Sequence, residues 1–154
     1  MATAERSAEV VWRGDLADGE GTLMVMSGAL AELSVDWEAR TERPDGRTSP
    51  EELLAAAHAI CYAMSLSHVL SEQGHAPEEL IVTATCTLDR ADTALRISTL
   101  DLRVVGYVPD LDPEAFAEAA RQAEQACPVS NAIRGNVEIH LEARLETRPE
   151  RMAA

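Results

Sequence analysis

The strongest constraint on this chain is one long apolar stretch with helix start and stop signals at its two ends. Residues 49–74 read SPEELLAAAHAICYAMSLSHVLSEQG. Ser49 at the N-cap, Pro50 at the first helical position and Glu52 three residues after the cap form a capping-box start. Gly74 is a typical stop signal, so we predict a helix of about 24 residues. Apolar or small residues occupy nearly every side of its first half, which is typical of a buried helix.

The rest of the chain indicates an α+β fold. Alternating apolar and polar residues predict strands at 8–15, 21–28, 31–40, 79–90, 94–108 and 136–146. A helix opened by Asp112 and Pro113 is predicted over 112–126, followed by a second, short helix over 127–135. The order is therefore β-β-β-α-β-β-α-α-β. Because no repeat or long linker divides the chain, we expect a single domain over residues 1–154, with a ragged end after residue 147.

The central helix predicts a second copy of the chain. A helix that is apolar on all sides must be covered on all sides. One small sheet covers only one side, and a chain of 154 residues has little else with which to cover the other. We therefore expect a homodimer in which the central helices pack together.

Charge and targeting signals exclude several classes of partner. The chain carries 13 basic and 27 acidic residues, a formal net charge of −14. Nucleic acids and anionic membranes need a clustered basic face, so neither is expected as a partner. The sequence has no uninterrupted apolar run of membrane-spanning length and no recognisable signal peptide, which favours the cytoplasm.

Three cysteines are candidates for chemistry, and they form no CxxC cluster. Cys61 lies in the apolar helix, where it is either a small hydrophobic side chain or a reactive thiolate. Cys127 directly precedes Pro128, at the predicted start of a helix, where backbone N–H groups stabilise a thiolate. Cys86 lies in an alternating strand between two threonines, and structural filler is the better interpretation there.

Other polar residues admit structural interpretations as well. Arg40 ends the third predicted strand, and Glu51 lies in the first turn of the central helix, where a negative charge is favourable. His58 is one helical turn before Cys61 on the same face, so it either hydrogen-bonds the thiol or is a core histidine. A zinc site would need a distant set of ligands with no local pair spacing, namely His58, Cys61, Cys127 and His140. No metal is expected.

Two motifs together resemble the OsmC/Ohr family, the osmotically inducible and organic hydroperoxide resistance proteins. They are TSPEELLAAAHAICYAMSLSHVL, residues 48–70, and CPVSNAI, residues 127–133. The likeness extends to WRGDLADGEGT, residues 12–22, and an arginine after the third strand is more similar to the OsmC branch. The resemblance implies a cysteine-based peroxidase that acts on organic (alkyl or fatty acid) hydroperoxides, built as an intertwined α+β homodimer.

Four residues receive roles from this resemblance. Cys61 corresponds to the peroxidatic thiolate, and Cys127 to the resolving cysteine that forms a disulfide with it. Arg40 and Glu51 correspond to the polar partners that hold the thiolate and orient the peroxide. The family needs no bound cofactor, and an external dithiol reductant protein, of the lipoyl type, resets the disulfide.

Helix geometry limits how these residues meet. Glu51 and Cys61 are ten residues apart, or about 15 Å along an unbroken helix. Either Arg40 bridges that distance, or the helix breaks, or Glu51 comes from the partner subunit, which we favour. Arg43 and Arg47 lie in the same loop as Arg40 and are alternatives to it.

A second function remains open from the sequence. The chain would then be a non-catalytic dimeric binding protein that holds a small hydrophobic ligand in its interface pocket. Such a protein needs neither Cys61 nor Cys127, and the presence of both favours the enzyme.

Overall fold

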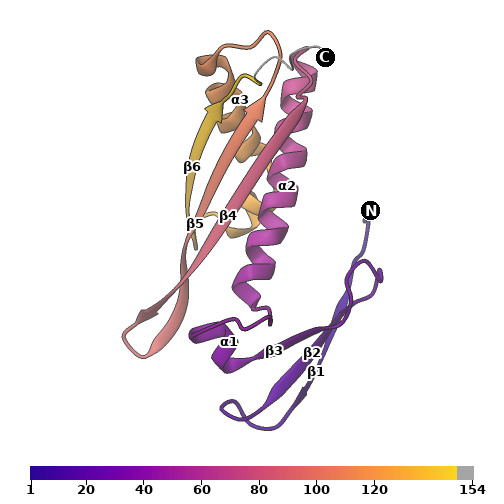
Figure 1. Cartoon of the computed structure of the whole chain (residues 1–154), viewed down its shortest axis with the longest axis vertical. Coiled ribbons are helices and arrows are strands. Elements are labelled where there is room, and N and C mark those ends of the chain that lie inside the picture. The colour runs from indigo at the N-terminus through magenta and orange to yellow at the C-terminus, as the bar shows by residue number, and fades with distance from the viewer. Residues whose placement is uncertain (149–154) are drawn as a thin grey trace, which may run out of the picture. The chain divides into compact units, whose positions relative to one another are not determined.

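The structure is a computed structural model that describes residues 1–148 of the chain. These residues form two compact units, residues 1–53 and the chain from Leu54 onward. Figure 1 shows the elements of each unit. The single domain over residues 1–154 stays a prediction, and most of its predicted ragged end lies outside the described residues.

The first unit is a small antiparallel sheet followed by one helical turn. Its strands pair in the order β1-β2-β3, with bounds Ala8–Arg13, Glu20–Val25 and Leu33–Asp36, and α1 follows at Trp37–Thr41. The predicted third strand over 31–40 was therefore wrong in its second half. The Asp36 carboxylate accepts the Ala39 N–H at 2.7 Å and caps α1, so a local side-chain cap ends the strand there. Arg40 lies on this helix and not at a strand end.

The long helix α2 runs unbroken from Pro50 to Glu72, close to its predicted bounds. At its start, the Ser49 hydroxyl accepts the Glu52 N–H at 3.2 Å. The Glu52 carboxylate accepts the Thr48 hydroxyl at 2.6 Å, which is not the return bond to the cap that the capping box predicts. At its end, Gly74 adopts a φ of 82° that favours glycine, as expected of a helix stop.

The second unit is built on another sheet, with strand order β4-β5-β6. β4 and β5 are an antiparallel hairpin, whereas β5 and β6 are parallel. A parallel pair needs a long crossover, and α3 and α4 fill it. The bounds are Glu79–Ala91, Ala94–Tyr107 and Glu138–Leu145 for the strands, and Pro113–Ala126 and Pro128–Ile133 for the helices. The element order confirms the predicted α+β fold, with α1 added.

The core of the second unit lies between one face of the sheet and two helices. Leu100, Leu102 and Val104 alternate along β5 and so share one face. They join a buried cluster with residues such as Tyr62 of α2 and Phe116 of α3, and Figure 1 shows both helices running along the sheet. The opposite face carries polar side chains, including Thr83, Thr85, Asp101, Arg103, His140 and Glu142.

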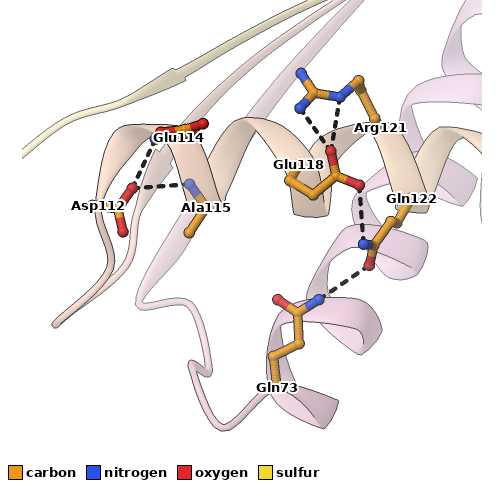
Figure 2. A network of polar contacts seen from close by, with 7 residues as sticks. All are labelled: Gln73, Asp112, Glu114, Ala115, Glu118, Arg121 and Gln122. Carbon is orange, nitrogen blue, oxygen red and sulfur yellow. Dashed lines mark hydrogen bonds and ion pairs between the residues drawn. The ribbon is translucent and has the colours of Figure 1, made fainter.

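Polar contacts join the end of α2 to α3, as Figure 2 shows. The Asp112 carboxylate caps α3, as the sequence predicts, by accepting two backbone N–H groups at 3.0 Å. Gln73, the residue directly after α2, donates to Gln122 at 3.1 Å. Gln122 and Arg121 both donate to Glu118, at 3.2 and 2.7 Å. These exposed contacts contribute little energy each. Among the contacts drawn, the one between Gln73 and Gln122 connects the end of α2 to α3, and the others lie within α3 and its cap.

The single chain covers one side of α2, as expected, and the burial of its other side by a second copy stays a prediction. His58, Tyr62, Leu66 and Leu70 are fully buried, but Met64 is 69% exposed. Within residues 1–148, α2 is the helix long and apolar enough to cross a membrane by length and composition, a test that core helices of soluble proteins also pass.

Candidate active site

The structure brings Cys61 and Cys127 together. Cys61 comes from the middle of α2, and Cys127 is the single residue between α3 and α4. Cys127 is fully buried and Cys61 is half-buried, and both are thiols in this structure. Their side chains share a hydrogen bond. Two cysteines 66 residues apart in the sequence are therefore positioned for a disulfide or for thiol exchange.

The surroundings shift the pKa values of the two thiols in opposite directions. Burial acts to raise the pKa of Cys127, but hydrogen bonds from the backbone and side chain of Ser130, from the Cys61 thiol and from the Val129 N–H together lower it below the usual range. Burial raises the pKa of Cys61, the Val129 N–H offsets this in part, and the contact with Cys127 adds to the rise. The thiolate expected of Cys127 at a helix start is thus supported. A thiolate at Cys61 needs a positive group close to it.

A buried histidine and serine lie beside Cys127. His58 Nε2 is 2.6 Å from Ser130 Oγ, and both side chains are fully buried. His58 Nδ1 has no hydrogen-bond partner among the described residues. Burial lowers the pKa of His58, and the nearby Glu124 carboxylate opposes this. The sequence analysis considered His58 but missed Ser130. Ser130 is part of the Cys-Pro-Val-Ser-Asn motif, which could have pointed to it.

Two further contacts of the second unit were not foreseen. Arg134 donates to the Glu124 carboxylate at 2.8 Å, and Glu124 is only 7% exposed. The hydroxyl of Tyr62, the residue after Cys61, donates to the Ala120 carbonyl at 3.1 Å. This bond holds α3 against α2 next to the cysteine.

Arg40 and Glu51 form an ion pair in the first unit. Arg40 Nη2 donates to Glu51 Oε1 at 2.7 Å, and Arg40 Nε lies 3.1 and 3.2 Å from the two carboxylate oxygens. The Arg40 guanidinium also lies 5.8 Å from the Trp37 ring centroid. Of the two alternatives in the loop, Arg47 pairs with Asp36. Arg40 is therefore the arginine that Glu51 holds.

His140 is part of a surface cluster. Its Nδ1 lies 2.6 Å from Asp101 and its Nε2 lies 2.9 Å from Glu138. Its hydrogen bond to Glu138, followed in size by the one to Asp101, raises the pKa of His140. Within residues 1–148, no three His, Cys, Asp or Glu side chains are grouped so as to hold a metal ion, so the zinc ligands considered from the sequence do not come together.

Comparison with known proteins identifies the class. The model of the family described as OsmC-like protein matches residues 43–142, and the chain belongs to this family. Peroxiredoxin OsmC of Escherichia coli strain K12 is 34% identical over 135 residues, which cover 88% of this chain and 94% of the relative. The organic hydroperoxide resistance protein OhrB of Bacillus subtilis strain 168 is 34% identical over 137 residues, covering 88% and 96%.

Solved structures agree with the fold. The crystal structure of Bacillus subtilis OhrB superposes with a TM-score of 0.72 at 30% identity, covering 90% of this chain and 98% of that one. An organic hydroperoxide resistance protein OsmC from Legionella pneumophila gives a TM-score of 0.71 at 26% identity, covering 94% and 99%. The family resemblance and the predicted α+β fold are confirmed.

Proposed function

We propose that this protein is a thiol-dependent peroxidase that reduces organic hydroperoxides, alkyl or fatty acid, to alcohols. The observation that carries the proposal is the contact between Cys61 and Cys127, which α2 and the β5–β6 crossover supply from distant parts of the sequence. The names of the relatives, peroxiredoxin and organic hydroperoxide resistance protein, support a function of the peroxidase type.

The proposed reaction has three steps. The Cys61 thiolate attacks the distal peroxide oxygen and the O–O bond breaks, which leaves a Cys61 sulfenic acid and, after a proton is taken up, an alcohol. The Cys127 thiolate then attacks the Cys61 sulfur, so the S–S bond forms and hydroxide leaves as water after protonation. An external dithiol, of the lipoyl type, reduces the disulfide by exchange and is itself oxidised to a disulfide.

Arg40 supplies the charge that Cys61 lacks. Burial raises the pKa of the Cys61 thiol, and a guanidinium next to the sulfur would reverse that shift. Glu51 would hold Arg40 in place through the ion pair already described. Because α2 is unbroken, a helix break does not bring these residues to Cys61, and we infer that the partner subunit's copy of the ion pair does so.

A homodimer provides that partner. Ile60 and Met64 of α2 are exposed by 58% and 69%, and side chains of this kind on a helix beside the reactive cysteine support packing against a second copy. We place the protein in the cytoplasm, where thiols are kept reduced between turnovers.

Consumption of cumene hydroperoxide or tert-butyl hydroperoxide with a dithiol reductant tests the function. Cys61→Ser should abolish turnover, because the attacking sulfur is lost. Cys127→Ser should leave one fast turnover and a trappable sulfenic acid. Cys86→Ser is the matched control and should behave as the unmodified protein. Wild-type consumption equal to that of Cys61→Ser would refute the peroxidase, and tight binding of an apolar probe by that inactive protein would favour the binding-protein alternative.

A mixed dimer tests which subunit supplies Arg40. Arg40→Met alone should slow peroxide reduction by at least about threefold at a pH below the Cys61 pKa, since one pKa unit lowers the thiolate fraction tenfold and raises its nucleophilicity about threefold. The loss of the group that orients the peroxide adds to this. Differently tagged Arg40→Met and Cys61→Ser chains are co-expressed, and the mixed dimer is purified. If the partner supplies Arg40, this dimer keeps one intact site and about half of the wild-type rate. A mixed dimer no faster than half the rate of the Arg40→Met homodimer would show that Arg40 acts within its own chain.

A further inference from the structure

A chain of buried polar side chains ends on the Cys127 sulfur, and the proposed reaction does not yet use it. His58 Nε2 lies 2.6 Å from Ser130 Oγ. The Ser130 side chain in turn hydrogen-bonds Cys127. His58, Ser130 and Cys127 all have no exposed surface. Buried polar groups are costly unless each is satisfied, so three in series call for an explanation beyond packing.

We propose that His58 and Ser130 are positioning residues for disulfide formation: His58 holds the Ser130 hydroxyl so that its proton points at the Cys127 sulfur and stabilises the thiolate. The proposal rests on the proposed function, because it assigns the pair to the second step of that reaction.

The direction of the hydrogen bonds follows from the donor count. Burial lowers the pKa of His58, so the ring is neutral near pH 7 and carries one N–H. If that N–H is on Nε2, it donates to Ser130 Oγ, and the serine's own proton is free for Cys127. His58 Nδ1, which has no partner among the described residues, is then a bare lone pair. The opposite direction would put a proton on Nδ1 and bury an unpaired N–H, which is rare in proteins.

The step balances without a change in His58 or Ser130. The Cys127 thiol has already released its proton to solvent when its thiolate attacks the Cys61 sulfenic acid. The S–S bond forms, the S–O bond breaks, and hydroxide leaves as water with a proton from solvent. Among the described residues, Cys61 and Tyr62 of α2 are the other titratable groups that interact with Cys127. The Glu124 charge of α3 acts on His58 and Tyr62, and Arg134 compensates it.

The acidity of Cys127 is the first readout. A Cys61→Ser, Cys86→Ser background leaves Cys127 as the one cysteine of the chain. Its thiolate is titrated by ultraviolet absorbance, with and without a further substitution. Ser130→Ala should raise the midpoint by about one pH unit, since a hydrogen bond to a charged group contributes about 1.5 kcal/mol. His58→Leu should raise it too, whereas His58→Gln, which retains an N–H donor, should restore most of the shift.

Single-turnover kinetics is the second readout, with both reactive cysteines present. At a pH below both midpoints, a midpoint one unit higher lowers the thiolate fraction tenfold and raises its nucleophilicity about threefold, so disulfide formation should slow about threefold. The rate of sulfenic acid formation should change far less. This split distinguishes positioning from a structural defect, which would slow both steps. Ser130→Thr, which keeps the hydroxyl, should retain a faster second step than Ser130→Ala.

An unchanged midpoint in Ser130→Ala, or equal midpoints for His58→Leu and His58→Gln, would overturn the proposal. If Ser130→Ala does not fold, the two His58 variants decide it alone. The titration requires no peroxidase activity, so its result separates this inference from the proposed function. Shifted midpoints in a protein that consumes no peroxide would refute the function and leave the Cys127 assignment standing.

Discussion

Substitution of Gly106 by alanine tests whether the packing of α3 on the sheet is as tight as the structure indicates. Gly106 lies on β5 under the ring of Phe116, which is fully buried. A Cβ atom at Gly106 would lie 2.5 Å from Phe116 Cε2, would overlap Cζ as well, and would be 3.4 Å from Leu80 Cδ2. Carbon atoms in contact prefer about 3.5–4.0 Å. The ring, or the whole of α3, must therefore move by about 1 Å.

The expected loss can be worked out from two opposing effects. Overpacking a filled core costs about 1–3 kcal/mol. Replacing glycine by alanine restricts the unfolded chain and recovers about 0.4–1 kcal/mol. Gly106→Ala should therefore lower the free energy of unfolding by about 1–2 kcal/mol, which lowers the melting temperature by about 2–8 °C for a chain of this length.

A double-mutant cycle identifies the cause. Phe116→Leu removes the clashing ring edge, so Gly106→Ala should cost at least about 1 kcal/mol less in that background. Urea unfolding followed by circular dichroism, at one fixed protein concentration because association shifts stability, measures all four proteins. An increase in stability for Gly106→Ala alone, or an equal cost in both backgrounds, would refute the packing argument.

Three further predictions concern single contacts. Arg134→Met leaves the buried Glu124 carboxylate without its charged partner, with Gln125 as a remaining donor, and should lower the free energy of unfolding by about 1–2 kcal/mol in urea denaturation. Tyr62→Phe removes the side-chain donor to the Ala120 carbonyl and should cost about 1 kcal/mol in the same assay, which a Tyr62→Phe curve identical to wild type would contradict. The pKa of His140 is raised by its two carboxylate partners, so its contribution is complete below the unfolded pKa of about 6.5 and is lost as pH rises through the folded pKa. His140→Gln should thus lower the melting temperature at pH 5.5 and leave it unchanged at about pH 9, and equal losses at both would disprove the linkage.

The sequence predicted the elements of this fold well because its start and stop signals are local. Ser49 and Gly74 mark the ends of α2, and Asp112 begins α3, through contacts with residues only a few positions away. The failure at residues 37–41 has the same origin. Asp36 is also a local cap, but it lies in a segment whose alternating pattern favours a strand.

The candidate site was predictable only in part. The identities of Cys61, Cys127, Arg40 and Glu51 came from motifs, and the structure pairs them as Cys61 with Cys127 and Arg40 with Glu51. Arg43 and Arg47 lie close to Arg40 in the chain. Which of the three arginines Glu51 pairs with depends on where α1 ends. No periodicity or spacing contains that information.

The sequence by itself determined most of the helices and strands, though not α1, as well as where the central helix begins and ends and which thiols are candidates. Those properties depend on neighbours within a few residues. Only the tertiary structure decided that Cys127 is the more acidic thiol and that Ser130 links it to His58. Acidity depends on burial and on donors that the β5–β6 crossover carries to α2, and contacts across such distances in the chain exist only once the chain has folded.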